Sequence, residues 1–403
     1  MEDYSSAKLK ACVQDVGGVV SLNLSGKGLS RVPDAVTELT EVEELWLDDN
    51  NLTELPTSIN KLKNLITLHL NGNKFTELPS EIGDLKELRR LDVSYNQLVS
   101  LPPSVQKLNQ LKELYLYGNK FTELPSDIGD LKELLSLDVS NNQLISLPTS
   151  VQRLHQLEEL HLSDNKLTEL PSEIGDLKKL RRLSVSDNQL VSLPTSIQKL
   201  NQLEELYLSG NRLTELPSEI GDLKELRKLN VSNNQLVSLP TSVQRLHQLE
   251  ELHLSDNKLT ELQSEIGDLK ELKKLNVSIN QLVSLPTSVQ RLHHLEDLRL
   301  SDNKLTELPS EIGDLKKLKK LYVTDNQLVS LPTSIQKLNQ LEELYLSGNR
   351  LTELPSEIGD LKELRSLDVS GNPLSMDAIH VLEMKKKGRT SSVITGGCGD
   401  NFQ

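Results

Sequence analysis

Apolar and polar residues follow one pattern along almost the whole chain of 403 residues. In the stretch LEELYLSGNRL, residues 203–213, the letters E-L-Y-L-S alternate between polar and apolar side chains. This alternation is typical of a short strand with one buried and one exposed face. Leu206 and Leu208 are predicted to be buried, which leaves Tyr207 on the exposed face.

An asparagine follows each of these predicted strands. The asparagines recur at a constant step of 23 residues from Asn50 to Asn372, without insertion or deletion. One step before Asn50, Lys27 takes this place in the imperfect copy LNLSGKGLSRVP, which gives 16 copies in all. A fixed period of this length predicts a stack of repeats rather than a globular domain.

Each part of the repeat has a physical interpretation. The L-x-L strand buries its leucines and pairs in parallel with the next copy, and the asparagine side chain can bond backbone groups of its own turn and of the neighbouring turn. The dipeptide LP ends the strand side, because proline cannot donate to a ladder. A segment such as SEIGDLKEL then returns as a short helix or 3₁₀ segment. A single copy cannot bury its apolar face, so stacked copies share one extended core.

Two longer periods are superimposed on the first. Copies with SEIGDLKEL alternate with copies of the type TSVQKLNQL, so the longer unit has 46 residues. Residues 187–227 are also identical to residues 325–365. Internal duplication explains this identity, so a residue that recurs through many copies can recur simply by copying.

The repeat resembles that of the leucine-rich repeat family over roughly residues 20–374. Its L-P-x-x-I-x-x-L half is similar to the intracellular Ras-group repeat scaffolds, namely Erbin, Scribble and Ras suppressor-like repeats. The resemblance implies an α/β fold: a curved solenoid of 16 repeats with a parallel sheet on the concave face and short helical or 3₁₀ segments on the convex face. It also implies that partners bind on the concave face.

The ends of the chain are predicted to differ from the repeats. A helix that begins at Ser5 or Ser6 and ends at Gly17 would place four apolar residues on one face: Leu9, Cys12, Val13 and Val16. The predicted organisation is an N-terminal helical cap (1–19), the repeat solenoid (20–374), a C-terminal helical cap (375–388) and a disordered tail (389–403).

Composition narrows the class of partner and the compartment. The formal net charge is −14, and nucleic-acid binding requires a basic surface, so no nucleic-acid partner is expected. No stretch is long and apolar enough for a membrane span, and the first residues do not form a secretory signal. The only two cysteines, Cys12 and Cys398, lie at opposite ends. These features predict a cytoplasmic location without membrane contact. The oligomeric state stays open, with a monomer favoured.

No motif in the chain carries catalytic chemistry. None of the eight histidines is placed beside a partner acid by a motif, and the GGCG stretch at 396–399 lacks the Lys-Ser/Thr of a phosphate-binding loop. We therefore expect a protein that is not an enzyme and that has no cofactor or metal.

The exposed strand position between the paired leucines gathers most of the aromatic residues. Such a gathering on one surface is typical of a protein-binding patch, although aromatic residues also suit strands and copying raises their number. The candidate binding residues from this column are Trp46, His69, Tyr115, His161, Tyr207, His253, Arg299, Tyr322 and Tyr345, with Tyr117 from an adjacent column.

Charged residues on the same face form two patterns. Just before the first leucine, acids and bases alternate from repeat to repeat, as in Glu251 and Lys274, which predicts a ladder of ion pairs that supports stacking. Acids nevertheless exceed bases over the exposed strand and turn positions, so the face is expected to attract a basic partner. Three turn acids are candidate binding residues for this reason: Asp187, Asp256 and Asp302.

These observations favour a non-enzymatic scaffold or adaptor in intracellular signalling that binds a protein on an acidic, aromatic-rich concave face. Two alternatives stay open. One is a recognition module of an immune or receptor-like protein. The other is a regulatory subunit of a phosphatase or small-GTPase complex.

Overall fold

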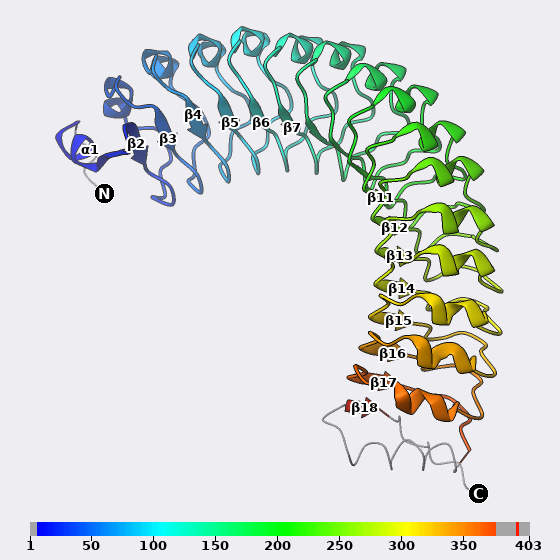
Figure 1. Cartoon of the computed structure of the whole chain (residues 1–403). Coiled ribbons are helices and arrows are strands. Elements are labelled where there is room, and N and C mark those ends of the chain that lie inside the picture. The colour runs from blue at the N-terminus through cyan, green and yellow to red at the C-terminus, as the bar shows by residue number, and fades with distance from the viewer. Residues whose placement is uncertain (1–5, 376–391, 395–403) are drawn as a thin grey trace, which may run out of the picture. The chain divides into compact units, whose positions relative to one another are not determined.

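The structure is a computed structural model that describes residues 6–375 and 392–394. The chain divides into two compact units, Met1–Leu203 and Glu204–Gln403. Each unit is a stack of short parallel strands on one side and 3₁₀ segments on the other, and the strands of unit 1 line its concave side (Figure 1). This is the leucine-rich-repeat type of solenoid that the sequence predicts. We call the exposed side of the strands the sheet face and the opposite side the helical face.

Unit 1 begins with a short helix and a hairpin, which the repeats follow. Its helix is α1 (Ser6–Cys12), and its strands are β1 (Val13–Val16), β2 (Val19–Asn23), β3 (Glu44–Trp46), β4 (Thr67–His69), β5 (Arg90–Asp92), β6 (Glu113–Tyr115), β7 (Ser136–Asp138), β8 (Glu159–His161) and β9 (Arg182–Ser184). Its 3₁₀ segments are η1 (Asp34–Glu38), η2 (Thr57–Lys61), η3 (Ser80–Asp84), η4 (Pro103–Lys107), η5 (Ser126–Asp130), η6 (Thr149–Arg153), η7 (Ser172–Asp176) and η8 (Thr195–Lys199).

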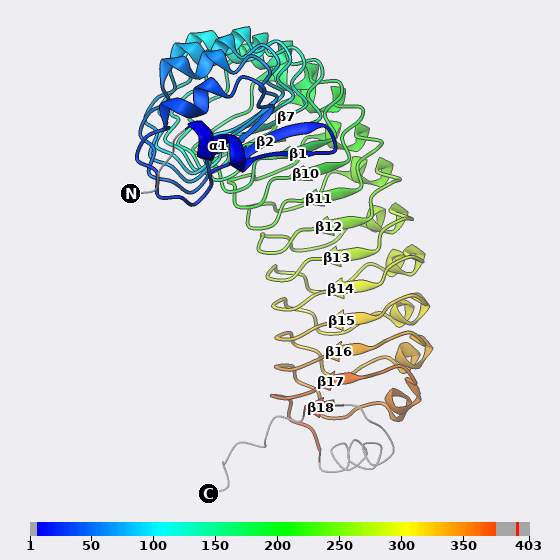
Figure 2. The same ribbon diagram turned by 90° about the vertical axis from the view of Figure 1, so that its left-hand side faces the viewer.

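Unit 2 continues the same alternation (Figure 2). Its strands are β10 (Glu205–Tyr207), β11 (Lys228–Asn230), β12 (Glu251–His253), β13 (Lys274–Asn276), β14 (Asp297–Arg299), β15 (Lys320–Tyr322), β16 (Glu343–Tyr345), β17 (Ser366–Asp368) and β18 (Ser392–Ile394). Its 3₁₀ segments are η9 (Ser218–Asp222), η10 (Thr241–Arg245), η11 (Ser264–Asp268), η12 (Thr287–Arg291), η13 (Ser310–Asp314), η14 (Thr333–Lys337) and η15 (Ser356–Asp360).

Strands pair so that equivalent residues of consecutive repeats lie side by side. In unit 2, for example, Leu252 pairs with Leu275 and His253 with Asn276. Leu206 and Leu208 are fully buried, and Tyr207 between them is half-buried on the sheet face. The strand register predicted from the alternation of apolar and polar residues is therefore confirmed.

The buried asparagine of each repeat holds its turn to the preceding repeat. The Oδ1 atom of Asn280 accepts a hydrogen bond from the Leu259 N–H at 3.0 Å. Its Nδ2 atom donates to the Leu254 carbonyl at 3.0 Å, and also to the carbonyls of Val277 and Ser278 at 3.1 Å. The prediction that this side chain bonds its own turn and the neighbouring one is confirmed.

The period of 46 residues has a steric cause on the helical face. From η3 to η13, the glycine of each glycine-bearing segment packs directly against the serine of the next repeat. A Cβ atom built on Gly221 would lie 2.3 Å from the carbonyl oxygen of Ser242, far inside van der Waals contact. The alternate repeats carry a larger residue in the glycine position, such as Gln244. The 3₁₀ segments therefore pack as close pairs, one glycine-bearing segment followed by one serine-bearing segment.

The N-terminal segment differs from the predicted single helix. Helix α1 ends at Cys12, and Val13 and Val16 lie instead in strand β1, which pairs antiparallel with β2 through the turn at Gly17 and Gly18. Leu9 is buried, as predicted, whereas Cys12 is exposed. Pairing with β2 satisfies backbone groups at the first strand edge, which a helix in this place would leave open.

The predicted C-terminal elements lie mostly outside the described residues. This applies to the helical cap predicted over 375–388, except for Ser375, and to most of the tail predicted over 389–403. Within that tail, Ser392–Ile394 form strand β18, which runs parallel to β17, so these three residues differ from the predicted disorder. The boundaries of the cap and the tail stay a prediction.

Gln263 is the residue that stands where most repeats have proline. Its backbone has φ −71° and ψ 158°, close to the −65° and 150° of Pro309 at the equivalent position, and its Oε1 atom is buried without a hydrogen-bond partner. We expect Gln263→Pro to raise the free energy of unfolding by about 0.5–1 kcal/mol, because the unfolded chain loses freedom and the native backbone needs no change. Urea unfolding measures this, with Pro309→Gln as the reverse variant. A lower midpoint for Gln263→Pro would show that the backbone N–H of Gln263 makes a needed bond.

The close packing of paired 3₁₀ segments can be tested at Gly221. We expect Gly221→Ala to destabilise unit 2 by about 1–3 kcal/mol, because the added methyl group must push the Ser242 backbone away. Gln244→Ala, at the same position of the next repeat, is the control and should change stability by less than about 0.5 kcal/mol. Equal losses for the two variants in urea unfolding would contradict this steric explanation of the longer period.

Candidate functional site

The sheet face of unit 2 presents one column of side chains across consecutive strands. The register places each member beside the next, about 4.8 Å away. The column runs through Tyr207, Asn230, His253, Asn276, Arg299, Tyr322 and Tyr345. Their neighbours along the strand are buried leucines and valines, so the column has an apolar base. We call it the central column.

Three planar groups of the central column are stacked. The rings of Tyr322 and Tyr345 lie 4.9 Å apart at an angle of 2°, and the Arg299 guanidinium lies 5.0 Å from the centre of the Tyr322 ring. The Tyr322 hydroxyl donates to Glu343, and the Tyr345 hydroxyl accepts a hydrogen bond from Ser366 at 3.2 Å. The rings are therefore held in place before any partner binds, and they are half-buried rather than fully exposed.

The hydrogen bond between Tyr322 and Glu343 also affects both proton affinities. Burial, and then this hydrogen bond, raise the pKa of Tyr322 above its ordinary value. The same hydrogen bond, followed by the ammonium of Lys320, holds the pKa of Glu343 below its ordinary value. Glu343 thus stays ionised and Tyr322 stays a neutral donor throughout the physiological range.

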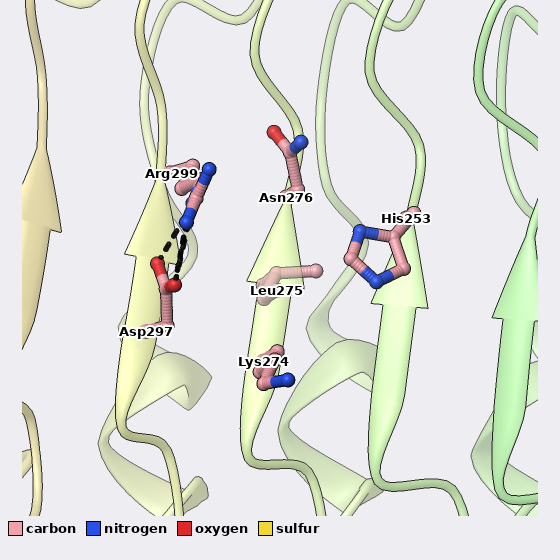
Figure 3. Close-up of a pocket in the computed structure, with 6 residues that line it drawn as sticks. All are labelled: His253, Lys274, Leu275, Asn276, Asp297 and Arg299. Carbon is pink, nitrogen blue, oxygen red and sulfur yellow. Dashed lines mark hydrogen bonds and ion pairs between the residues drawn. The ribbon is translucent and has the colours of Figure 1, made fainter.

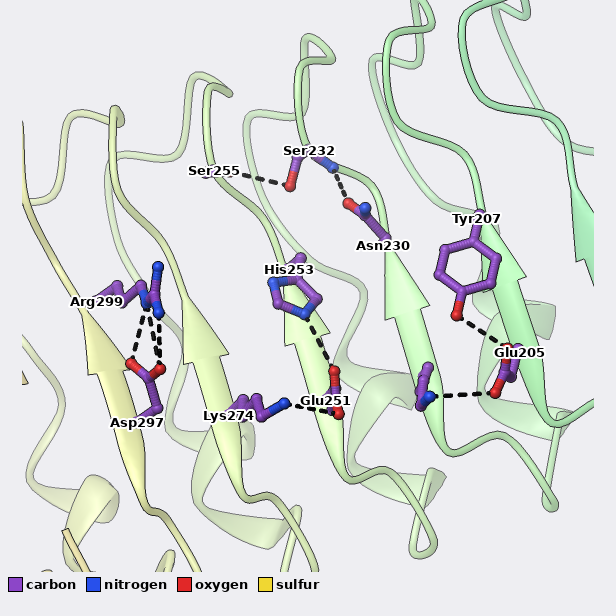
Figure 4. A network of polar contacts seen from close by, with 11 residues as sticks. Glu205, Tyr207, Asn230, Ser232, Glu251, His253, Ser255, Lys274, Asp297 and Arg299 are labelled. Carbon is purple, nitrogen blue, oxygen red and sulfur yellow. Dashed lines mark hydrogen bonds and ion pairs between the residues drawn. The ribbon is translucent and has the colours of Figure 1, made fainter. Parts of the chain in front are cut away.

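The predicted ladder of opposite charges lies beside the central column. Lys228 pairs with Glu205 at 3.2 Å and Lys274 with Glu251 at 3.1 Å (Figure 4). Further along, Lys320 pairs with Glu343 at 2.9 Å, and Arg299 makes two short bonds to Asp297, at 2.9 and 3.0 Å. The charges of this ladder largely neutralise one another, so the alternation serves stacking, as predicted.

A hollow of about 240 Å³ interrupts the central column above Asn276 (Figure 3). We call it the Asn276 notch, and it is lined by His253, Lys274, Leu275, Asn276, Asp297 and Arg299. Asn276 leaves room because its Oδ1 atom accepts a hydrogen bond from the Ser278 N–H at 3.1 Å, which turns the amide along its own strand. Asn230 makes the same bond to Ser232 at 3.0 Å.

Comparison with known proteins places the chain in a family. A leucine-rich repeat model matches residues 40–98, 86–144, 132–190, 155–213, 201–259 and 224–282, and a leucine-rich repeat region model matches 286–386. A solved leucine-rich repeat protein of Leptospira interrogans is 39% identical, with a TM-score of 0.89, over 93% of this chain and 95% of that one. The chain belongs to the leucine-rich repeat family. Proteins of this family generally act as non-enzymatic protein-binding modules.

Two solved receptors are also similar to this leucine-rich repeat chain. The plant peptide hormone receptor RGFR1, solved in complex with RGF2, is 30% identical with a TM-score of 0.71, over 90% of this chain and 68% of the receptor. Toll from Drosophila, solved in complex with Spatzle, is 25% identical with a TM-score of 0.75, over 85% of this chain and 49% of that one. No curated protein sequence matches the chain. The finer resemblance to the Ras-group scaffolds stays a prediction.

The turn acids have a backbone explanation that the sequence reading missed. Asp187, Asp256 and Asp302 occupy the position just before the buried asparagine, where φ is 53°, 54° and 56°. Glycine, asparagine and aspartate are the residues that tolerate this left-handed conformation. The acids are exposed and negatively charged, but their place in the repeat follows from the turn as well as from any partner.

Two leucine-rich repeats break this rule for the turn residue. In unit 2 it is Ile279, with φ 54° and a side chain that is 51% exposed. In unit 1 it is Tyr95, with φ 51° and 55% exposure. A β-branched residue in the left-handed region is strained, and here it also exposes apolar surface. The sequence already shows this exception, because Ile279 stands at a repeat position that is otherwise mostly Gly, Asn or Asp.

In unit 1 the candidate residues are less accessible than predicted. The Trp46 ring stacks on the His69 ring at 3.7 Å and 10°. His69 is 6% exposed, and burial lowers its pKa. The prediction that His69 lies exposed on the face is therefore wrong: the tryptophan covers it, and it supports the Trp46 ring.

The other candidates in unit 1 contact residues of neighbouring repeats or of their own strand. The Arg90 guanidinium lies 4.8 Å from the centre of the Tyr115 ring, whose hydroxyl donates to Glu113 at 3.0 Å. Tyr117 meets Tyr95 edge to face at 4.9 Å. His161 lies 3.6 Å from Glu159. The candidate residues thus fall into one set per unit, and the unit 2 set forms the longer stack.

Within residues 6–375 and 392–394, no group of three or more histidine, cysteine, aspartate or glutamate side chains could hold a metal ion. In the same part of the chain, none of the helices has the length and apolar character needed to cross a membrane.

The strain at Ile279 predicts a stabilising substitution. We expect Ile279→Asn to raise the free energy of unfolding by about 1 kcal/mol, because asparagine tolerates the left-handed conformation at lower cost. Val283→Asn is the matched control, since Val283 is 55% exposed and does not have a positive φ. The control should be neutral or slightly destabilising in urea unfolding. A loss of stability for Ile279→Asn would mean that its side chain makes a contact worth more than the strain.

Proposed function

We propose that this protein is a non-enzymatic scaffold or adaptor that binds a protein partner on the sheet face of unit 2. The observation that carries the proposal is the stack of Arg299, Tyr322 and Tyr345, in which the guanidinium is exposed and both rings are half-buried and held by stacking and hydrogen bonds. Covering rings that are already fixed costs little conformational entropy, so such a stack is a favourable anchor for a partner.

The proposed partner has a basic contact surface. The chain carries a formal net charge of −14. The acids of the ladder are paired with lysines and arginines, whereas Asp256, Asp302 and Asp325 stand exposed at the turn edge of the same face. These turn acids would attract basic residues from a distance and add little to the final contact. A role as a monomer in intracellular signalling, in the cytoplasm, is part of the same proposal.

A second candidate function is a recognition module of a receptor-like protein. The 30% identity to a plant receptor that was solved with a peptide hormone favours it. In this alternative the sheet face would hold an extended peptide rather than the surface of a folded protein. Binding of short peptides with the full affinity of the native partner would favour this candidate.

Site-specific photocrosslinking can test where the partner binds. A photoreactive phenylalanine analogue at Tyr345 should crosslink the partner, and the same analogue at Lys224 on the helical face should not. The crosslinked protein is then identified and purified for binding measurements. Crosslinking only from Lys224 would contradict a site on the sheet face.

Substitutions separate the contribution of aromatic contact to affinity from that of long-range charge attraction. Tyr207→Ala and Tyr345→Ala should each leave the fold intact, and each one inside the footprint should weaken binding by about 1–3 kcal/mol, mostly through faster dissociation. Asp302→Asn should instead slow association and reduce its salt dependence. Glu225→Gln, a neutralised acid next to η9, is the control. Unchanged affinity for all three variants with the purified partner would refute the proposal.

A further inference from the structure

The central column of unit 2 has the geometry of a stack with one member missing. Arg299 lies 5.0 Å from Tyr322, and Tyr322 lies 4.9 Å from Tyr345, so the planar groups follow the strand spacing. On the other side of Arg299, Asn276 occupies the next place and His253 the one after it. The strands that carry His253 and Arg299 are therefore two strand spacings apart, roughly 10 Å. One planar group fits between them at the spacing of the existing stack.

The walls and floor of the Asn276 notch suit an aromatic ring. Arg299 and His253 lie on opposite sides of the notch (Figure 3). The guanidinium of Arg299 can stack on an aromatic face, and the His253 ring turns its edge toward the notch, which suits an edge-to-face contact. Leu275 lies at the floor (Figure 3). Asn276 itself is held away by its bond to Ser278, so the ring needs to displace no internal contact.

The polar end of the notch favours a ring that carries a hydroxyl. In the same column the hydroxyl of Tyr207 donates to Glu205 at 2.9 Å, in the row of charges beside the column. At the notch this row offers Lys274 and Asp297. The hydroxyl of an inserted tyrosine would meet a donor and an acceptor there, whereas an aliphatic side chain would leave both without a new partner.

We propose that the Asn276 notch receives a tyrosine-type aromatic side chain of the protein partner, which extends the stack of Arg299, Tyr322 and Tyr345 toward His253. This inference rests on the proposed function and adds the chemistry of the anchor. The residues around the notch indicate which side chains flank the aromatic residue in the partner segment. Ile279, exposed and strained in the same repeat, offers an aliphatic contact, and Asp256 and Asp302 on the two adjacent repeats favour basic residues. The partner segment thus carries an aromatic anchor flanked by aliphatic and basic side chains.

Two substitutions at one position test the notch. Asn276→Tyr fills it with the ring that the column already uses at Tyr322 and Tyr345, and Asn276→Ser leaves it open with the residue that the equivalent column of unit 1 uses at Ser184. Circular dichroism and thermal unfolding should show both variants folded. The added tyrosine should raise the midpoint or leave it unchanged, because it stacks on Arg299 and contacts the edge of His253.

The first measurement needs no identified partner. N-acetyl-L-tyrosinamide is titrated into the full chain and followed by saturation-transfer NMR, with N-acetyl-L-leucinamide as the aliphatic comparison. The tyrosine probe should bind with a dissociation constant in the millimolar range, as expected for so small a ligand, and at least fivefold more tightly than the leucine probe. Asn276→Tyr should weaken this binding at least tenfold, Asn276→Ser should keep it within about twofold, and Arg299→Lys, which removes a planar wall, should weaken it several-fold.

The outcomes separate this inference from the proposed function. Three results would overturn the proposed notch. They are equal binding of both probes, no binding of the tyrosine probe by the wild type, and unchanged binding of that probe by Asn276→Tyr. The purified partner gives the second measurement: Asn276→Tyr should lower its affinity at least tenfold and Asn276→Ser less than threefold. If Tyr345→Ala lowers the affinity for the partner but Asn276→Tyr does not, the notch is overturned and the proposed function stands. If the variants change binding of the tyrosine probe as expected but the partner binds the helical face, the notch is an aromatic-binding site, and both the proposed function and the partner as its occupant are refuted.

Discussion

The hydrogen bonds of a buried asparagine hold each repeat to the one before it, and the rest of the fold depends on them. In the repeat of Asn280, one side chain accepts from the N–H of Leu259 and donates to three carbonyls. These backbone groups are buried and would each cost about 1–3 kcal/mol if left without a partner. Neither the strand nor the turn can therefore change length without losing several bonds at once, which accounts for a period that stays at 23 residues throughout. The left-handed residue before the asparagine, such as Asp302, is part of the same turn.

A scaffold fixed in this way leaves few positions free to vary, and the candidate site is built from those positions. The leucines and asparagines are buried in the inner repeats, whereas the central column changes from tyrosine to asparagine to histidine between neighbours. Because the column has a constant spacing, such changes in size become notches and stacks at defined intervals. The charge ladder beside it is largely neutral in sum, so shape and planarity distinguish one stretch of the face from another more than charge does.

Much of the fold could be predicted from the sequence, since the strands, their register and the bonding of the asparagine all follow from local alternation and a fixed period. The site was only partly predictable. The sequence placed Tyr322 and Tyr345 in one column, but not the coplanarity of their rings. It gave no sign that Trp46 would cover His69, because relative exposure within a column depends on the size of both neighbours. The turn acids were interpreted as partner-attracting charge alone, because backbone dihedral angles are not visible in an alternation pattern. Strand β1 was missed because Val13 and Val16 fit a helical face as well as a strand.

The close contact between Gly221 and Ser242 bears on how an array of this kind can grow. A glycine-bearing segment fits only beside a serine-bearing one, so inserting a single repeat would place two segments of the same kind next to each other and break the fit on the helical face. Inserting two repeats restores it. The viable step of lengthening or shortening is therefore the pair, and the internal duplication at an offset of 138 residues, three such pairs, obeys this rule. Steric matching on the helical face thus sets the smallest step, two repeats, by which the sheet face can be extended.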